Sequence, residues 1–218
     1  MQRTGLAMAA AAIALAASSA DATMIQLVFD PTFGSTENTG STARVSFEFS
    51  EVGLDDVLTL TIENTTPPEI GSKITAVGFE LPDVPPLSVL FAAGGAGPYF
   101  DTLTFDDSVS PGWLDAPGGY DVMISSEGGF EGGSPQGAAE AGDSEVVTLT
   151  LGDTGMTPNQ LAQTFRDFYD SAPDRYAVAR FQSVGRNGED SDKVGGEVPE
   201  PASLVLLALG GLALIRRR

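Results

Sequence analysis

Apolar and polar residues alternate along much of the chain, and this period-two pattern constrains the fold more than any other feature. Ile25, Leu27 and Phe29 share one face of an extended segment, and Val45 and Phe47 repeat the pattern further on. Successive side chains of a β-strand point to opposite faces, so these segments are half-buried strands. The same reasoning predicts nine strands, over residues 25–29, 44–50, 57–62, 73–81, 87–92, 99–105, 120–125, 144–151 and 175–184.

Glycine- and proline-rich turns separate these short strands, which is typical of antiparallel all-β proteins and not of parallel α/β sheets. We therefore predict a mainly β fold, an antiparallel β-sandwich that is Greek-key or jelly-roll-like, with one short amphipathic helix. The glycine-rich stretch 128–142 predicts a loop, because no phosphate-binding motif accompanies its glycines. Asn187-Gly188 predicts a hairpin turn after the last of the nine strands.

The sequence predicts one helix, over residues 158–169. Thr157 is its expected N-cap, and Gln160 completes a capping box in which each residue satisfies a backbone donor of the other. Its apolar residues fall on one stripe: Leu161, Phe165, Phe168 and Tyr169. We expect this stripe to lie across a sheet edge or to cap one end of the sandwich. A membrane-binding face is the alternative, and the polar side, with one arginine and two aspartates, disfavours it.

The first 22 residues have the organisation of a signal peptide. A positive residue, Arg3, precedes the short alanine-rich apolar run 6–17, and small residues follow at the expected cleavage positions, Ala20 and Ala22. We therefore expect export through the Sec machinery and cleavage by signal peptidase. The prediction divides the chain into a signal peptide (1–22), a secreted body (23–197) and a C-terminal segment (198–218).

The C-terminal segment has three parts. It begins with a proline-containing tetrapeptide: Val198, Pro199, Glu200 and Pro201. An apolar run at 202–215 follows, and the chain ends in three basic residues: Arg216, Arg217 and Arg218. Prolines keep the tetrapeptide extended and open to a protease. The run covers about 21 Å as a helix, against about 30 Å of bilayer hydrocarbon, so we predict a short transmembrane helix whose arginines reach the cytoplasmic interface.

This order of elements resembles the PEP-CTERM sorting signal of Gram-negative bacteria. The resemblance implies an exosortase-type membrane peptidase that cuts near residues 199–201 and releases or transfers the protein to the cell surface. It also implies a precursor with a single pass in the inner membrane, and a mature form at the surface or in the extracellular matrix. Extracellular polysaccharide is then an expected neighbour and a possible partner. The stretch 180–194 is also similar to the closing strand and hairpin of secreted PEP-CTERM proteins that have no assigned activity.

Charge and composition exclude several function classes. All 30 acidic residues lie between residues 21 and 201, where only seven basic residues occur, a net charge of −23. Such a body repels nucleic acid and anionic lipid. The chain has no cysteine and no histidine, so it has no disulfides, no catalytic triad of the serine or cysteine type and no thiolate or imidazole zinc site. Neither Lys73 nor Lys193 lies in a Ser-x-x-Lys frame, which makes both surface charges.

Three kinds of site remain open. Acidic turns offer oxygen ligands for calcium at four aspartates, Asp106, Asp107, Asp190 and Asp192, although none has EF-hand spacing and solvated acidic loops are the favoured explanation. Aromatic faces for a sugar are available at Trp113, Tyr99 and Tyr120, where the alternative is a core position. Asn64-Thr65-Thr66 matches an N-glycosylation acceptor, and a turn before Pro67-Pro68 explains the same residues.

Three functions are compatible with these features. The first is a non-enzymatic structural or adhesive protein of the envelope or polysaccharide matrix, with no required cofactor. The second is a carbohydrate-binding module, which needs exposed aromatic side chains on one face. The third is a glycan-active enzyme that uses two carboxylates, a chemistry for which 30 acidic residues supply chance pairs without pointing to any one of them. We favour the first.

Overall fold

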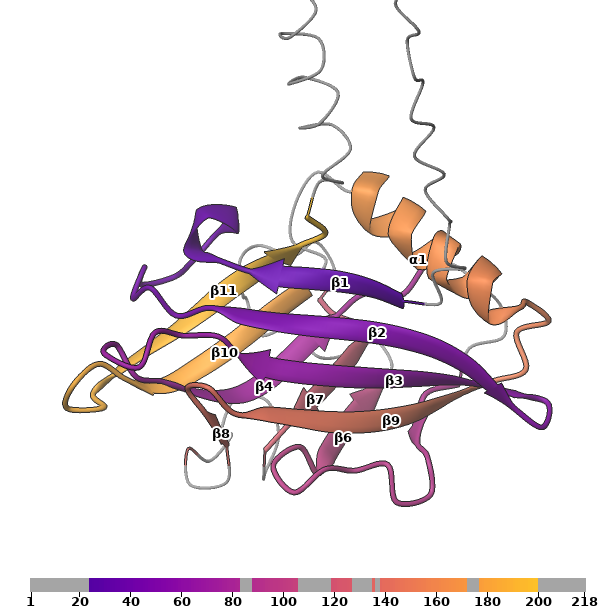
Figure 1. The fold of residues 1–218 in the computed structure, drawn as a ribbon, viewed down its shortest axis with the longest axis horizontal. Helices are drawn as coiled ribbons and strands as arrows, with labels where there is room; N and C mark the ends of the chain where they lie inside the picture. The colour runs from indigo at the N-terminus through magenta and orange to yellow at the C-terminus, as the bar shows by residue number, and fades with distance from the viewer. Residues whose placement is uncertain are drawn as a thin grey trace, which may run out of the picture.

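The fold is one continuous antiparallel sheet that bends back on itself into two layers (Figure 1). The computed structural model describes residues 24–82, 88–105, 119–126, 135, 138–171 and 177–199. Its strands are β1 (Met24–Phe29), β2 (Ala43–Val52), β3 (Asp55–Asn64), β4 (Lys73–Phe79), β5 (Leu90–Phe91), β6 (Thr102–Phe105), β7 (Val122–Ser125), β8 (Ala139–Glu140), β9 (Ser144–Gly152), β10 (Ala177–Val184) and β11 (Asp190–Glu197). A short 3-10 helix, η1 (Pro31–Phe33), follows β1.

Strand order explains the two layers. The order is β5-β9-β3-β2-β1-β11-β10-β4-β7-β6, with β8 paired to β4. In Figure 1, β9, β3, β2 and β1 form the front layer, and β11, β10, β4, β7 and β6 form the back layer. The β1–β11 pairing joins the layers, and β5 contacts β6 at the other side. The prediction of an antiparallel, mainly β fold is confirmed, but the strands form a nearly closed, barrel-like sheet where two separate sheets were expected.

The core lies between the two layers, and the period-two pattern places it there. On β2 the inward residues Val45, Phe47 and Phe49 are at most 2% exposed, while the residues between them are partly or fully exposed. The ring of Phe47 meets that of Phe79 on β4 edge to face, with 5.1 Å between centroids. Contacts of this kind across the interior make burial of apolar area the main stabilising term.

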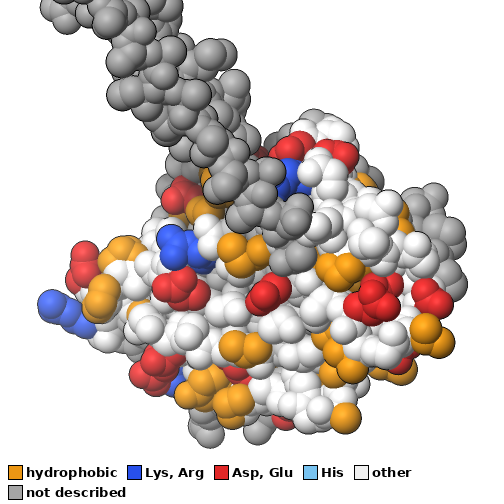
Figure 2. All heavy atoms as spheres, turned by 45° about the vertical axis from the view of Figure 1, so that its right-hand side comes forward, with side chains coloured by type: hydrophobic (Ala, Val, Ile, Leu, Met, Phe, Trp, Pro, Cys, Tyr) orange, Lys and Arg blue, Asp and Glu red, His pale blue; other side chains and the backbone are white. Residues whose placement is uncertain are grey.

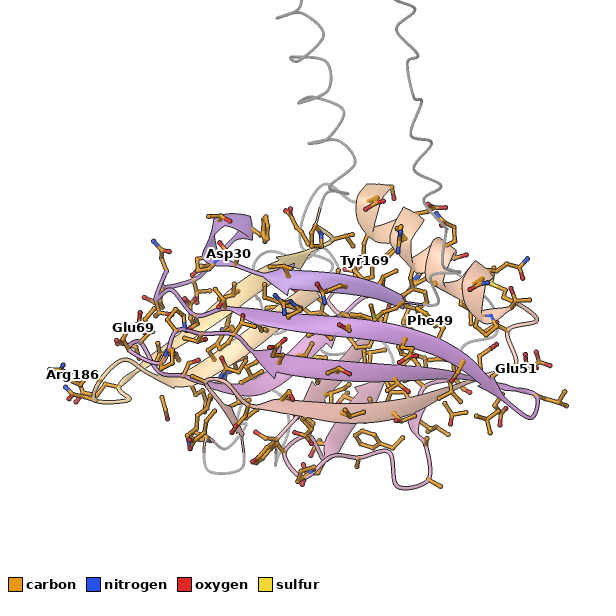
Figure 3. All side chains as sticks on the ribbon, in the orientation of Figure 1. Asp30, Phe49, Glu51, Glu69, Tyr169 and Arg186 are labelled. Atoms are coloured by element: carbon orange, nitrogen blue, oxygen red, sulfur yellow. The ribbon has the colours of Figure 1, made fainter. Side chains whose placement is uncertain are left out.

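The helix α1 (Pro158–Ser171) begins at the predicted residue and covers one open side of the interior. Its capping box is present, since Thr157 N donates to Gln160 Oε1 (2.8 Å) and Gln160 N donates to Thr157 Oγ1 (3.3 Å). Phe165 packs against Phe49 of β2, with ring centroids 4.7 Å apart. Figure 3 shows Phe49 and Tyr169 between the helix and the front layer. The prediction that the stripe caps one end of the sheet is therefore confirmed.

Two strands are not among the nine that alternation predicts, although the predicted hairpin at Asn187-Gly188 implies the second of them. Strand β8 lies inside the expected glycine-rich loop and pairs with β4 at Lys73↔Glu140. Strand β11 pairs with both β10 and β1, although its sequence lacks apolar alternation. The turn before it is the predicted hairpin, in which Gly188 has φ +66° and its N–H donates to Gly185 O (2.9 Å).

Several predictions fall on residues outside the described part of the chain. These are the signal peptide with Ala20 and Ala22, Trp113, Asp106 and Asp107, and the C-terminal residues Glu200, Pro201, Arg216, Arg217 and Arg218. Among the described helices, none is both long and apolar enough to cross a membrane.

Candidate functional site

The start of β1, the end of β11 and the face of α1 meet at one corner of the body. There they form an open pocket of about 260 Å³. Residues from all three elements line it, and they include Met24, Gln26, Arg166, Asp170, Val198 and Pro199. Because Val198 and Pro199 begin the predicted processing tetrapeptide, this pocket lies where the body leads into the C-terminal segment.

Arg166 ties α1 to the first described residue of β1. Its Nη2 donates to Met24 O (3.1 Å). Its Nε is buried and makes no hydrogen bond within the described part of the chain. Val198, which is half-buried, packs against the hydrophobic core, while Pro199 is exposed. The border between folded body and accessible chain therefore falls between these two residues.

Gly195 and Gly196 hold the end of β11 firmly in the sheet. Gly195 N donates to Gly34 O (2.9 Å), and its carbonyl accepts from Asp30 N (3.3 Å). Gly196 faces Phe29, whose ring would lie only 2.5 Å from any β-carbon added at that position. Phe29 is fully buried, so only glycine allows β11 to approach β1 this closely.

Asp192 is a buried carboxylate whose lone pairs are occupied by the chain itself. It is 1% exposed, and seven donor groups point at its two oxygens. They are the hydroxyls of Ser35, Thr36 and Thr39 and the backbone N–H groups of Thr36, Glu37, Thr39 and Lys193, at 2.8–3.2 Å. Burial raises the pKa of Asp192, but the hydrogen bonds outweigh it and hold the pKa below its usual value.

The structure separates the predicted calcium ligands that it describes. Asp190 is exposed at the start of β11, whereas Asp192 points into the loop before β2 and is fully engaged by donors. Within the described ranges no three acidic residues gather into a group that could hold a metal ion. Asp192 therefore organises residues 35–39 in the way that a bound anion would.

The predicted sugar-stacking tyrosines are placed differently from one another. Tyr99 is half-buried and packs against the core, and its backbone N–H donates to Glu145 Oε1 (2.9 Å). Tyr120 is only 2% exposed, so its ring offers no face to a sugar. The two residues do not form a joint aromatic platform.

Asn64 is fully buried, contrary to what a glycan acceptor requires. Its Nδ2 donates to Ser72 O and to Ala139 O, both at 3.1 Å, and its Oδ1 accepts from Thr66 N at 3.2 Å. The Asn64-Thr65-Thr66 sequence is therefore a buried, hydrogen-bonded turn before Pro67-Pro68. This was the alternative to an N-glycosylation acceptor.

A carboxylate pair that the sequence did not reveal lies beside Tyr169. Phe79 pairs with Val122, and continuing this register places Glu80 opposite Asp121. Burial first and the charge of Asp121 second raise the pKa of Glu80 to about 7. Tyr169 Oη donates to Glu80 O (2.7 Å) and ties α1 to this end of β4. The pairing of β4 with β7 brings the two acids together, so the sequence around either acid does not predict the pair.

A second open pocket, of about 320 Å³, lies at the other end of β4. Lys73 and Glu140 line it and form an ion pair, with 3.0 Å between Nζ and Oε1, and Ser72 and Ser183 also line it. Ser183 has φ +51°, a conformation that is uncommon for a residue with a side chain. Lys73, expected to be a solvated charge, is thus paired and less than one-third exposed.

Comparison with known proteins identifies one part of the chain. The family model described as the PEP-CTERM protein-sorting motif matches residues 197–218. No curated protein and no solved structure matches the chain. The match begins at Glu197, the last residue of β11, and thus starts where the sheet ends.

Proposed function

We propose that this chain, which carries a PEP-CTERM protein-sorting motif, is an exported precursor that an exosortase-type peptidase cleaves close to Pro199. One peptide bond breaks there, and the new carboxyl end of the body passes to water or to a nucleophilic group of the cell envelope. The body is then free at the cell surface or in the extracellular matrix, while the apolar run and the three arginines stay behind.

The observation that carries this proposal is the coincidence of two boundaries. The last strand ends at Glu197, and the sorting motif starts at that same residue. Cleavage beyond Val198 would leave all described strands and the helix intact. A segment that can be removed without loss of a strand is what a disposable sorting signal requires.

For the mature body we propose a non-enzymatic structural or adhesive role in the envelope or the polysaccharide matrix. The interior of the sheet is filled by side chains such as Phe47 and Phe79, so the barrel is a packed scaffold. Figure 2 shows acidic side chains spread over one face of the body, with few basic ones. Such a surface supports solubility and contact with cation-bridged or neutral polymers.

The processing step is tested by following the precursor in its own bacterium. Glu200→Ala and deletion of the exosortase gene should each cause a longer, membrane-bound form to accumulate. Glu189→Ala alters an exposed glutamate outside the motif and should be processed normally. Intact-mass analysis of released protein gives the cleavage point, and a released form that still ends in Arg218 would refute the proposal.

The structural role needs a separate assay. Cells that lack the gene should form a weaker or less cohesive matrix, and added purified body should bind the isolated extracellular polysaccharide. Normal matrix cohesion in the deletion strain, together with no binding, would exclude this role while leaving the processing step untouched.

A further inference from the structure

We propose that Gly195–Val198, the last three residues of β11 and the residue after them, is the segment that the processing peptidase binds as an extended chain, and that the folded body competes with the peptidase for it. This inference rests on the proposed function. The inference names the segment of the precursor that the peptidase must bind. It also explains why binding depends on the folded state of the body.

The spacing of the chain gives the first argument. Three residues separate Val198 from the apolar run that begins at Ala202, and at 3.3–3.6 Å each they reach about 10 Å from the body. A peptidase groove that holds four residues on the amino-terminal side of the cleaved bond is about 13 Å long. For a bond between Val198 and Pro199 these four residues are Gly195–Val198, and for a bond one or two positions further on the groove still takes up Glu197 of β11.

Those residues are occupied in the folded body. Gly195 and Gly196 are buried, and the N–H and C=O groups of Gly195 bond to Gly34 and Asp30, which both follow β1. Val28 pairs with Glu197. Extended peptides are captured through their backbone groups, so the same groups cannot serve β1 and a peptidase at once.

Opening of this end need not unfold the body. The β1–β11 pairing has only two register pairs, Val28↔Glu197 and Phe29↔Gly196, whereas β11 is held along most of its length by β10. Strand ends open at a lower free-energy cost than the core does. When opening and closing are faster than cleavage, the processing rate follows the fraction of molecules in which Gly195–Val198 is released.

The main experiment separates the pairing of this segment within the body from its binding to the peptidase. Insertion of Gly-Gly-Ser-Gly-Gly-Ser between Glu197 and Val198 in the full-length precursor supplies a free extended chain and leaves residues 198–218 unchanged. In pulse-chase experiments in the native bacterium, processing should become about tenfold faster or more, which corresponds to at least about 1.4 kcal/mol of removed restraint. The same six residues inserted after Gly53, at the β2–β3 turn, should not change the rate.

A point variant tests the inference at natural spacing. Gly196→Ala places a β-carbon against the buried Phe29 ring and should release the end of β11, so that processing accelerates. Ile62→Val, which trims a fully buried side chain on β3, controls for general loss of stability and should leave the rate unchanged.

Two results overturn the inference. One is a processing rate of the spacer variant that equals or falls below that of the natural chain. The other is equal acceleration of processing by Gly196→Ala and Ile62→Val, which would show that unfolding of the whole body, and not local release of Gly195–Val198, exposes the segment to the peptidase. If processing still requires Glu200 in either case, the proposed function stands and only this inference fails. If processing is independent of both Glu200 and the peptidase, the proposed function fails first.

Discussion

Removal of the Asp192 carboxylate should strongly destabilise the body. Three backbone N–H groups of the 35–39 loop, those of Thr36, Glu37 and Thr39, lose their acceptor in Asp192→Ala. A hydrogen bond to a charged group contributes about 1.5–3 kcal/mol, and such values are not additive within one network. Since the loop can partly re-solvate its donors, we expect a loss of about 3–5 kcal/mol, a large part of the stability of a typical domain.

Urea unfolding of the body, expressed without its flanking segments, measures this loss as a shift in midpoint at constant slope. Asp190→Ala is the matched control, because Asp190 lies on the same strand but is exposed, and a change of at most about 0.5 kcal/mol is expected. Asp192→Asn retains the shape but turns an NH₂ group toward donors, so it should resemble Asp192→Ala. Equal midpoints for the Asp190 and Asp192 variants would refute the view that this carboxylate organises the loop.

Three further predictions concern single side chains. The pKa of Glu80 is about 7 in the folded body and 4.5 without the fold, so stability should fall as pH rises from about 4.5 to about 7; Glu80→Gln should raise the urea midpoint at pH 8 and leave it nearly unchanged at pH 4.5. Phe165→Ala should cost about 3–5 kcal/mol and Thr157→Ala about 1 kcal/mol in the same assay, and the reverse order would contradict the core assignment of the helix stripe. Intact mass of the secreted protein should show no glycan on Asn64, and modified Asn64 in folded protein would contradict its burial.

The elements with strong local signals could be predicted from the sequence. Alternation at 44–50 predicts β2, because one face of that strand is buried and the other is not. The helix is predicted because Thr157 and Gln160 satisfy each other's backbone groups at its first turn, a contact that depends on neighbours in sequence alone. The sorting motif is likewise contained in one continuous stretch.

Features that depend on contacts between distant segments could not be predicted. Asp192 occupies an inward position of β11 where the alternation rule requires an apolar residue, and all of its donors except the N–H of Lys193 come from residues more than 150 positions earlier. The Glu80–Asp121 pair exists only because β4 and β7 align in one register. Closure of the sheet through β1 and β11 depends on Gly196 lying against Phe29. The sequence alone does not show which distant residue packs against a given glycine.

The negative charge of the body bears on whether the body stays at the membrane after the proposed cleavage. All 30 acidic residues of the chain lie between residues 21 and 201, against seven basic ones, whereas the last three residues are arginines. Anionic lipid repels the acidic body, so in the proposed function the apolar run and the arginines must supply the attraction that holds the precursor at the membrane. The proposed cleavage near Pro199 would remove that attraction and leave the repulsion. We therefore expect the body alone to stay in solution when sedimented with vesicles rich in anionic lipid at low salt, and the full-length chain to sediment with them; sedimentation of the body would show that its surface has a membrane affinity that its charge does not explain.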